Sequence, residues 1–152
     1  MIISYQGVEC FKISQGDLGI VTNPQSKISA DITLFTSGRS ETRPNDRPVG
    51  RASDKSGFVI TGPGEYEIKD IFVKGFLSKG KDLLNTIYTI SFEGMNLCFL
   101  GALADSAIPA DTLESLENID ILFVPIGGSP SSKASADQSK DVLGPAEAYK
   151  LA

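Results

Sequence analysis

Short apolar runs separated by turn residues dominate the first hundred positions of the chain. Residues 85–93, NTIYTISFE, alternate between two faces, and the EGMN that overlaps their end is typical of a tight hairpin turn. Alternation with a period of two predicts a strand, because successive side chains point to opposite faces of a sheet. Similar reasoning predicts strands within residues 2–5, 8–14, 18–23, 30–36, 57–61, 62–68, 71–78, 97–102 and 119–128.

Helical signals come late in the chain. Residues 109–118, PADTLESLEN, place Asp111 as the N-cap and Glu114 at the capping-box position of one helix. Residues 144–152 begin a second helix, with Pro145 near its first turn. Strands first and helices later predict a layered α+β domain, and the length predicts a single domain over residues 1–152.

Two polar stretches interrupt this pattern. Residues 37–56 have almost no apolar content and five basic side chains, which predicts a long polar loop, either solvated or able to dock an anionic partner. Residues 129–141 are rich in Ser and Ala, which predicts a flexible surface loop.

Charge and composition narrow the classes of partner. The 152-residue chain has a formal net charge of −5, which argues against nucleic acid and anionic membranes as partners. No apolar run reaches the ~18 residues of a membrane span, and no secretory signal is readable at the N-terminus. Cys10 and Cys98 lie in strand-like runs and are expected to be buried free thiols. We therefore expect a cytoplasmic protein.

The chain contains no histidine. Histidine is the commonest zinc ligand and the usual base that activates a serine or cysteine nucleophile. Its absence excludes a histidine-ligated metal centre and a Ser-His or Cys-His nucleophile within this chain.

The order of several motifs resembles the metallo-β-lactamase superfamily, in its small lactonase-like, Zn-dependent hydrolase branch. Residues 7–11, GVECF, stand where the branch has Gly-His-Ser/Ala-x-Phe, and residues 30–42 stand where it has a strand ending in Thr-His-x-His-x-Asp-His. Residues 62–76 resemble its Pro-Gly-Glu-Tyr-Glu segment, residues 85–103 its Asn-Thr-x-Tyr hairpin and Leu-Gly-Asp-Leu, and residues 116–128 its Asp-x-Leu-x-x-Pro-x-Gly-Gly strand. The resemblance implies an αβ/βα sandwich, here possibly without its last strand and helix.

The resemblance also identifies the positions of a lost metal site. In the family, the strand-end histidines and aspartates bind one or two metal ions that activate water. Here the three histidine positions are Ser37, Arg39 and Thr42, the first aspartate is Glu41, and the bridging aspartate of Leu-Gly-Asp-Leu is Ala102. We therefore predict a vestigial site with no zinc and no other cofactor.

The carboxylates near these positions allow two further arrangements, an ion pair with Arg39 and an oxygen-only metal site. Arg39 would repel a dication, and could fill the site by pairing with Glu41 or Asp105, or else lie in solvent. Asp31, Glu41 and Asp105 would form an oxygen-only Mg²⁺ or Ca²⁺ site if the fold brought them together.

A ligand cleft is the other candidate site. Glu65 and Glu67 share one strand face and could act as a carboxylate pair, although solvated side chains are the simpler interpretation. Gly127 and Gly128 end a buried strand that, by the resemblance, lines one side of the family's substrate cleft. Glu65, Asp105, Gly127 and Gly128 are therefore the candidate lining of a cleft.

The sequence favours a non-catalytic relative of these hydrolases that acts as a binding or structural module. One alternative is a residual metal-dependent hydrolase with a rebuilt carboxylate site. Another is a fragment of a longer or split hydrolase-like protein. An exposed sheet edge or helix face would favour a second copy or another protein as partner.

Overall fold

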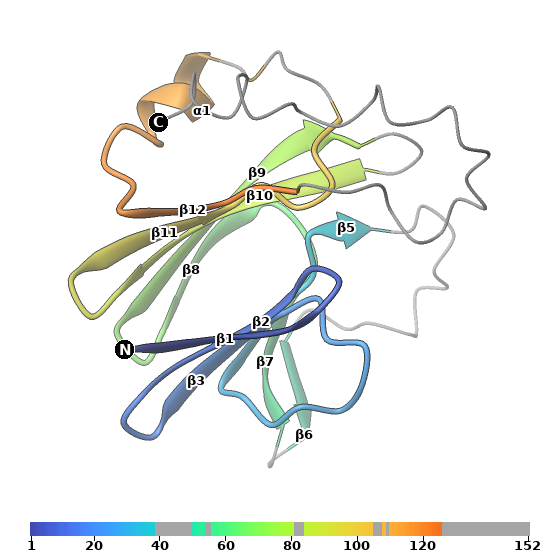
Figure 1. Ribbon diagram of the computed structural model, residues 1–152, viewed down its shortest axis with the longest axis vertical. Helices are drawn as coiled ribbons and strands as arrows, with labels where there is room; N and C mark the ends of the chain where they lie inside the picture. Colours follow the sequence, from blue (N-terminus) through green and yellow to red (C-terminus); the bar gives the residue numbers. More distant parts are fainter. Residues whose placement is uncertain (39–49, 54–55, 81–83, 105–107, 109, 126–152) are drawn as a thin grey trace.

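The computed structural model describes residues 1–38, 50–53, 56–80, 84–104, 108 and 110–125. In this part of the chain two six-stranded sheets pack face to face, and one short helix lies outside the second sheet (Figure 1). The predicted α+β sandwich is confirmed.

The first sheet consists of β1 (Ile2–Gly7), β2 (Cys10–Gln15), β3 (Leu18–Thr22), β4 (Ile32–Leu34), β6 (Gly50–Ser53) and β7 (Ser56–Ile60). Its order is β1-β2-β3-β4-β7-β6. The strands β1, β2 and β3 form an antiparallel meander, whereas β3, β4 and β7 are parallel. The carboxyl ends of these three parallel strands therefore meet at one edge of the sheet.

The second sheet consists of β5 (Ser37–Gly38), β8 (Gly64–Ile68), β9 (Ile71–Lys79), β10 (Leu84–Phe92), β11 (Met95–Phe99) and β12 (Ile121–Phe123). Its order is β12-β11-β10-β9-β8, and β5 pairs with the start of β10. The hairpin between β10 and β11 turns at Glu93 and Gly94, which both have positive φ, as the sequence predicted.

The main core lies between the two sheets. Ile13 and Ile20 of the first sheet pack with Tyr88 and Ile90 of the second, and all four are fully buried. The Tyr88 hydroxyl lies 3.2 Å from the carbonyl oxygens of Phe35 and Gly62 and donates a hydrogen bond in this buried corner. Burial raises the pKa of Tyr88, so the phenol stays a donor.

A second apolar cluster lies on the outer face of the second sheet. The helix α1 (Ala110–Glu114) precedes Leu116, which packs against Ile87, Cys98 and Leu100. The strands β10 and β11 therefore bury both of their faces, which explains their nearly continuous apolar sequence. Cys98 is free and buried, and burial raises its pKa to about 12; Cys10 is also free and buried.

Two sequence predictions need correction. The loop predicted over residues 37–56 is wrong at both ends, since Ser37–Gly38 and Gly50–Ser53 are strands; residues 39–49 and 54–55 lie outside the described part. Asp111 is not an N-cap, because the helix begins at Ala110. The predicted loop over 129–141 and the second helix lie outside the described residues. No helix of the described residues is long and apolar enough to cross a membrane.

Candidate functional site

The candidate site lies where strand ends of the two sheets meet. Asn23 directly follows β3, and Thr36 lies two residues beyond the end of β4. Asn85 is the second residue of β10, and Ala102 follows β11 by three residues. The strand β5 connects the two sheets here, since the chain leaves β4 and pairs with β10 within three residues (Figure 1).

Asn23 fastens the end of β4 to the end of β3. Its Nδ2 donates to Thr36 Oγ1 at 2.8 Å, and its Oδ1 accepts from the Thr36 backbone N–H at 2.9 Å. Its own backbone N–H donates to the Leu34 carbonyl at 2.8 Å. Asn23 has a φ of 41°, a left-handed conformation that Asn tolerates better than most residues. The backbone pairing of β3 with β4 ends at Thr22 and Leu34, and beyond that point the Asn23 side chain holds the two strand ends together by its hydrogen bonds to Thr36.

Asn85 does the same on the side of the second sheet. Its Nδ2 donates to Ser78 Oγ and to the Leu100 carbonyl, both at 2.8 Å, and its Oδ1 accepts from the Ala102 N–H at 2.9 Å. Asn85 is fully buried, and its bond to the Leu100 carbonyl is shielded from water, whereas its bonds to Ser78 and Ala102 are partly buried. Thr36 joins the two groups, because its carbonyl accepts from the Thr86 N–H at 2.6 Å.

Gly101 closes the contact between Thr36 and Asn85. It has a φ of 60°, and a Cβ placed on it would lie 2.5 Å from both Asn85 Oδ1 and Thr36 Cβ. Any larger residue would push the two strand ends apart. We call Asn23, Thr36, Asn85, Gly101 and Ala102 the strand-end network.

The structure brings two of the five predicted metal-site positions to this network. Ser37 is the Cα partner of Asn85 in the β5–β10 pairing, and the N–H of Ala102 is bonded to the same Asn85. The other three positions, Arg39, Glu41 and Thr42, lie outside the described residues.

Glu9 is the titratable group that contacts the network from the β1–β2 turn. Asn23 Nδ2 donates to Glu9 Oε2 at 3.2 Å, and Thr22 Oγ1 donates to the Glu9 carbonyl at 3.0 Å. Burial raises the pKa of the Glu9 carboxyl above its ordinary value. The neighbouring Val8 has a φ of 54°, a strained conformation for a β-branched residue.

These residues do not fit the metal centre that the resemblance implies. Ala102 offers only a methyl group, and Ser37 a neutral hydroxyl, where Zn²⁺ takes thiolate, imidazole or carboxylate ligands. The amide oxygens of Asn23 and Asn85 already accept backbone N–H groups. In the described residues no group of three Asp, Glu, Cys or His could hold a metal ion, and no buried side-chain polar atom lacks a partner.

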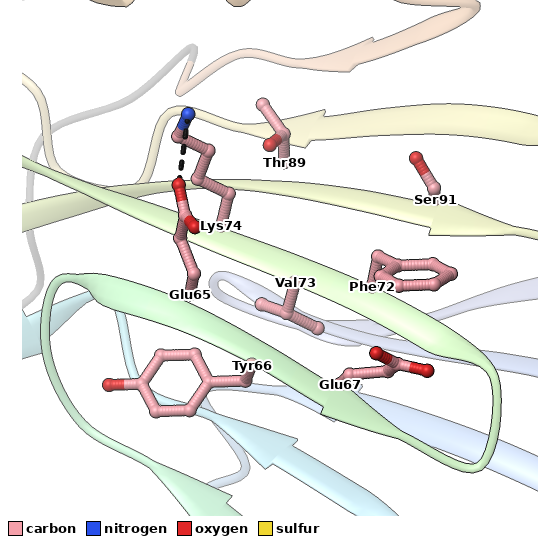
Figure 2. Close-up of a pocket in the computed structure, with 8 residues that line it drawn as sticks. All are labelled: Glu65, Tyr66, Glu67, Phe72, Val73, Lys74, Thr89 and Ser91. Carbon is pink, nitrogen blue, oxygen red and sulfur yellow. Dashed lines mark ion pairs between the residues drawn. The ribbon is translucent and has the colours of Figure 1, made fainter.

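Glu65 lies in a groove on the outer face of the second sheet, as Figure 2 shows. Its carboxylate pairs with Lys74 at 3.1 Å, and Glu67 and Phe72 lie farther along the same groove of about 530 Å³. Gly127 and Gly128, the other predicted cleft residues of a buried strand end, lie outside the described part of the chain.

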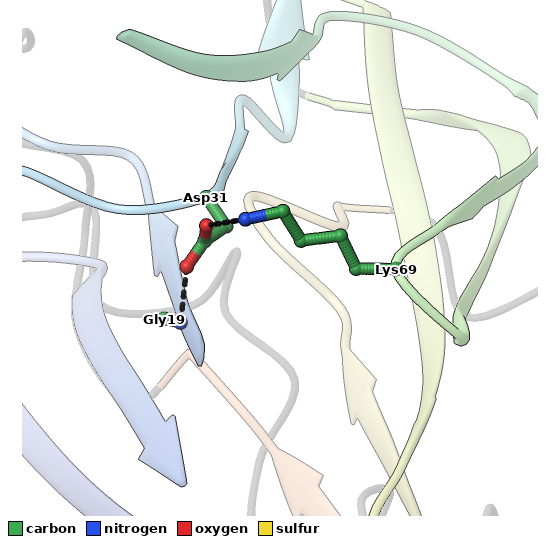
Figure 3. A network of polar contacts seen from close by, with 3 residues as sticks. All are labelled: Gly19, Asp31 and Lys69. Atoms are coloured by element: carbon green, nitrogen blue, oxygen red, sulfur yellow. Dashed lines mark hydrogen bonds and ion pairs between the residues drawn. The ribbon is translucent and has the colours of Figure 1, made fainter. Parts of the chain in front are cut away.

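Asp31 is committed to a structural contact. It precedes β4, whereas Ser37 follows it, so the two lie at opposite ends of this strand. Its carboxylate accepts from Lys69 Nζ at 2.5 Å and from the Gly19 N–H at 2.8 Å (Figure 3). Of the proposed oxygen-only site, Glu41 and Asp105 lie outside the described residues.

Asn23 and Asn85 are the positions of the strand-end network that sequence reasoning missed. Asn85 belongs to the Asn-Thr-x-Tyr stretch, so the resemblance already contained a signal for it. Asn23 stands before a proline and is indistinguishable from an ordinary turn residue, because the partners of its side chain are thirteen or more residues away.

A comparison with known protein families agrees with the fold described above. The family model described as "Beta-lactamase superfamily domain" matches residues 2–152. The chain belongs to this family. No protein with a curated description matches it.

Several solved structures share its fold. A protein described as a Zn-dependent hydrolase of the superfamily, from Thermotoga maritima, is 26% identical with a TM-score of 0.70. That match covers 98% of this chain and 68% of the other. The metallo-β-lactamase fold protein YhfI from Bacillus subtilis is 10% identical, with a TM-score of 0.52 over 76% of this chain and 61% of the other. CmlA, a diiron β-hydroxylase from Streptomyces venezuelae, is 12% identical, with a TM-score of 0.53 over 80% of this chain and 34% of the other.

Proposed function

We propose that this chain is a non-catalytic member of the beta-lactamase superfamily that acts as a binding or structural module. The main supporting observation is the strand-end network: the two described metal-site positions, Ala102 within it and Ser37 paired with its Asn85, supply no side chain of a kind that Zn²⁺ takes. Function in this fold resides in the site and not in the scaffold, so the loss of the ligands removes the basis for the family's hydrolysis.

The hydrogen bonds of the network support this proposal. A metal centre needs donor atoms that are free to coordinate, held in place by outer partners. Here the amide of Asn85 bonds the backbone of Leu100 and Ala102, and the amide of Asn23 bonds the backbone and hydroxyl of Thr36. These side chains therefore stabilise the strand ends themselves.

The charges at the five predicted metal-site positions also support a non-catalytic protein. Arg39 cannot deprotonate and opposes a dication, and Glu41 is the one carboxylate of the set. The two unpaired thiols, Cys10 and Cys98, are typical of a reducing compartment, so we place this module in the cytoplasm.

Thermal unfolding with and without metal tests the proposal. A specific ion at 100 times its dissociation constant stabilises a protein by about 2.7 kcal/mol, which raises the melting temperature by several degrees. We expect no such rise with Zn²⁺, Mn²⁺, Fe²⁺, Mg²⁺ or Ca²⁺, and no fall with a chelator.

A restored variant provides the matched control. Ser37→His, Arg39→His and Ala102→Asp together return three ligands, two imidazoles and one carboxylate, to the positions that the resemblance identifies. We expect Zn²⁺ to raise the melting temperature of this variant and not that of the unchanged chain. A rise of equal size in the unchanged chain would contradict the proposal and favour a hydrolase with a rebuilt carboxylate site.

A further inference from the structure

The four strands at the ends of the two sheet orders, β1, β6, β8 and β12, differ in charge. The edge strand β8 carries the exposed Glu65 and Glu67, and β6 carries Arg51. The edge strand β12 is three residues long and follows the exposed Asp120. Charges and short length are the usual means by which a sheet edge avoids pairing with another chain.

The edge strand β1 lacks these protections. It is six residues long, and no side chain in residues 1–8 is charged. Ile2, Tyr5 and Val8 are 67%, 64% and 50% exposed. Its register is regular from Ile2 to Tyr5 and shifts only between Tyr5 and Gly7. Among the described strands β1 pairs only with β2, so its other edge presents free backbone groups.

Aromatic rings extend the core to this edge. Phe99 and Phe123 stack at 4.0 Å between ring centroids, Phe123 contacts Phe11 at 4.7 Å, and Phe11 contacts Tyr5 at 5.2 Å. The row ends at Tyr5, which has lost little of its exposure to water. A strand added beside β1 would cover this ring and continue the core.

We propose that β1 pairs antiparallel with β1 of a second copy of this chain, which joins the two first sheets into one. A second copy fits because the chain has a net charge of −5, and β1, which has no charged side chain, lets two copies meet without bringing carboxylates face to face. This inference goes beyond the proposed function and does not depend on the state of the metal site.

Symmetry and the inner-face positions define the register. In a symmetric antiparallel pair, one residue faces its own counterpart, and residues of one face meet residues of the same face. Ile3 and Tyr5 face the core, because they pair with Ile13 and Phe11 of β2. With Ile3 on the two-fold axis, Met1 of one copy meets Tyr5 of the other, and Ile2 meets Ser4. This register uses the regular part of β1 and covers Tyr5.

Sedimentation velocity over a concentration series measures the association. We expect a dimer whose dissociation constant rises at least roughly tenfold in Ile2→Lys, because two ammonium groups enter the shared face. The matched control is Leu77→Lys, which places the same charge at a residue 55% exposed in β9 of the second sheet, a different sheet from that of β1. We expect this control to dimerise like the unchanged chain.

Cysteine crosslinking identifies the contact even if Ile2→Lys fails to fold. Facing residues of an antiparallel pair have Cα atoms within the range that a disulfide spans. Ile3→Cys should therefore form a covalent dimer on mild oxidation, whereas Ser91→Cys, on the outer face of β10, should not. A monomer at concentrations on the order of 1 mM, a dimer that Ile2→Lys leaves intact, or a failure to crosslink at Ile3 would overturn the proposal.

Discussion

Val8 carries backbone strain at the tip of the β1–β2 turn. It is a β-branched residue with a φ of 54°, and it is half exposed, so packing does not explain its identity. The resemblance places a family histidine at this residue. Strain of this kind is often kept at functional sites, so we interpret Val8 as a remnant of an altered site.

Relief of this strain should stabilise the protein. Val8→Gly removes the Cβ that disfavours the left-handed conformation, and we expect the free energy of unfolding to rise by about 1 kcal/mol. Denaturant unfolding measures the change. Val8→Ala is the control, because alanine keeps the Cβ and should gain less. An equal gain in both variants would show that strain is not the cause.

Asn85 should be the most sensitive polar residue of the strand-end network. Asn85→Ala leaves the Ala102 N–H and the Leu100 carbonyl without this partner in a buried site. We expect a loss of about 2–4 kcal/mol in the free energy of unfolding.

Asn96→Ala is the matched control for Asn85. Asn96 also bonds a carbonyl, that of Asn118, but at an exposed place on β11, where water can replace the side chain. We expect it to lose no more than about 1 kcal/mol. Losses of similar size at both positions would contradict a buried network.

At the scale of elements, Asp31 and Lys69 connect the two sheets away from the strand-end network. Asp31 precedes β4 of the first sheet, and Lys69 lies in the β8–β9 turn of the second (Figure 3). The hydrogen bond and charge of Lys69 lower the pKa of Asp31. A lowered carboxyl pKa stabilises the fold above the unfolded value, near 3.9, and the stabilisation is lost as the pH falls through the folded value.

The charge-neutral variant Asp31→Asn should therefore be less stable at pH 7, by under about 1 kcal/mol, since Lys69 is exposed. Its difference from the unchanged chain should shrink as the pH falls below 4. Unfolding measured across this range tests both points. Glu65→Gln, which breaks the more exposed pair with Lys74, should lose less. A difference that stays constant with pH would exclude the ion pair as the cause.

Strands with a regular pattern of apolar residues could be predicted from the sequence. Strands that form only because a neighbouring strand offers hydrogen-bond partners could not. β10 and β11 bury alternate residues in two cores, so their pattern is strong. β5 and β6 read Ser-Gly and Gly-Arg-Ala-Ser, which contain no period; they are strands because β10 and β7 supply hydrogen-bond partners. The sequence places the start of α1 too late, because an aspartate such as Asp111 is favoured both as the N-cap and within the first turn of a helix.

At the scale of the whole molecule, the site could be predicted only in part. The motif order predicts Ser37 and Ala102 as metal-site positions, and the fold brings both to Asn85. The network beside them joins residues at the ends of β3, β4, β10 and β11, and such contacts between two sheets leave no local trace in a sequence. Three of the remaining predicted positions, Arg39, Glu41 and Thr42, stay predictions.

The metal content of the purified, untagged chain tests the central claim most directly. The protein is incubated with excess Zn²⁺, Mn²⁺, Fe²⁺, Mg²⁺ and Ca²⁺ in turn, desalted, and its metal content measured by elemental analysis. Because the family's metal-binding side chains are replaced in this chain, we expect a metal occupancy near zero for every ion. About one ion per chain would contradict the account, and Glu41→Gln would then show whether that carboxylate holds it.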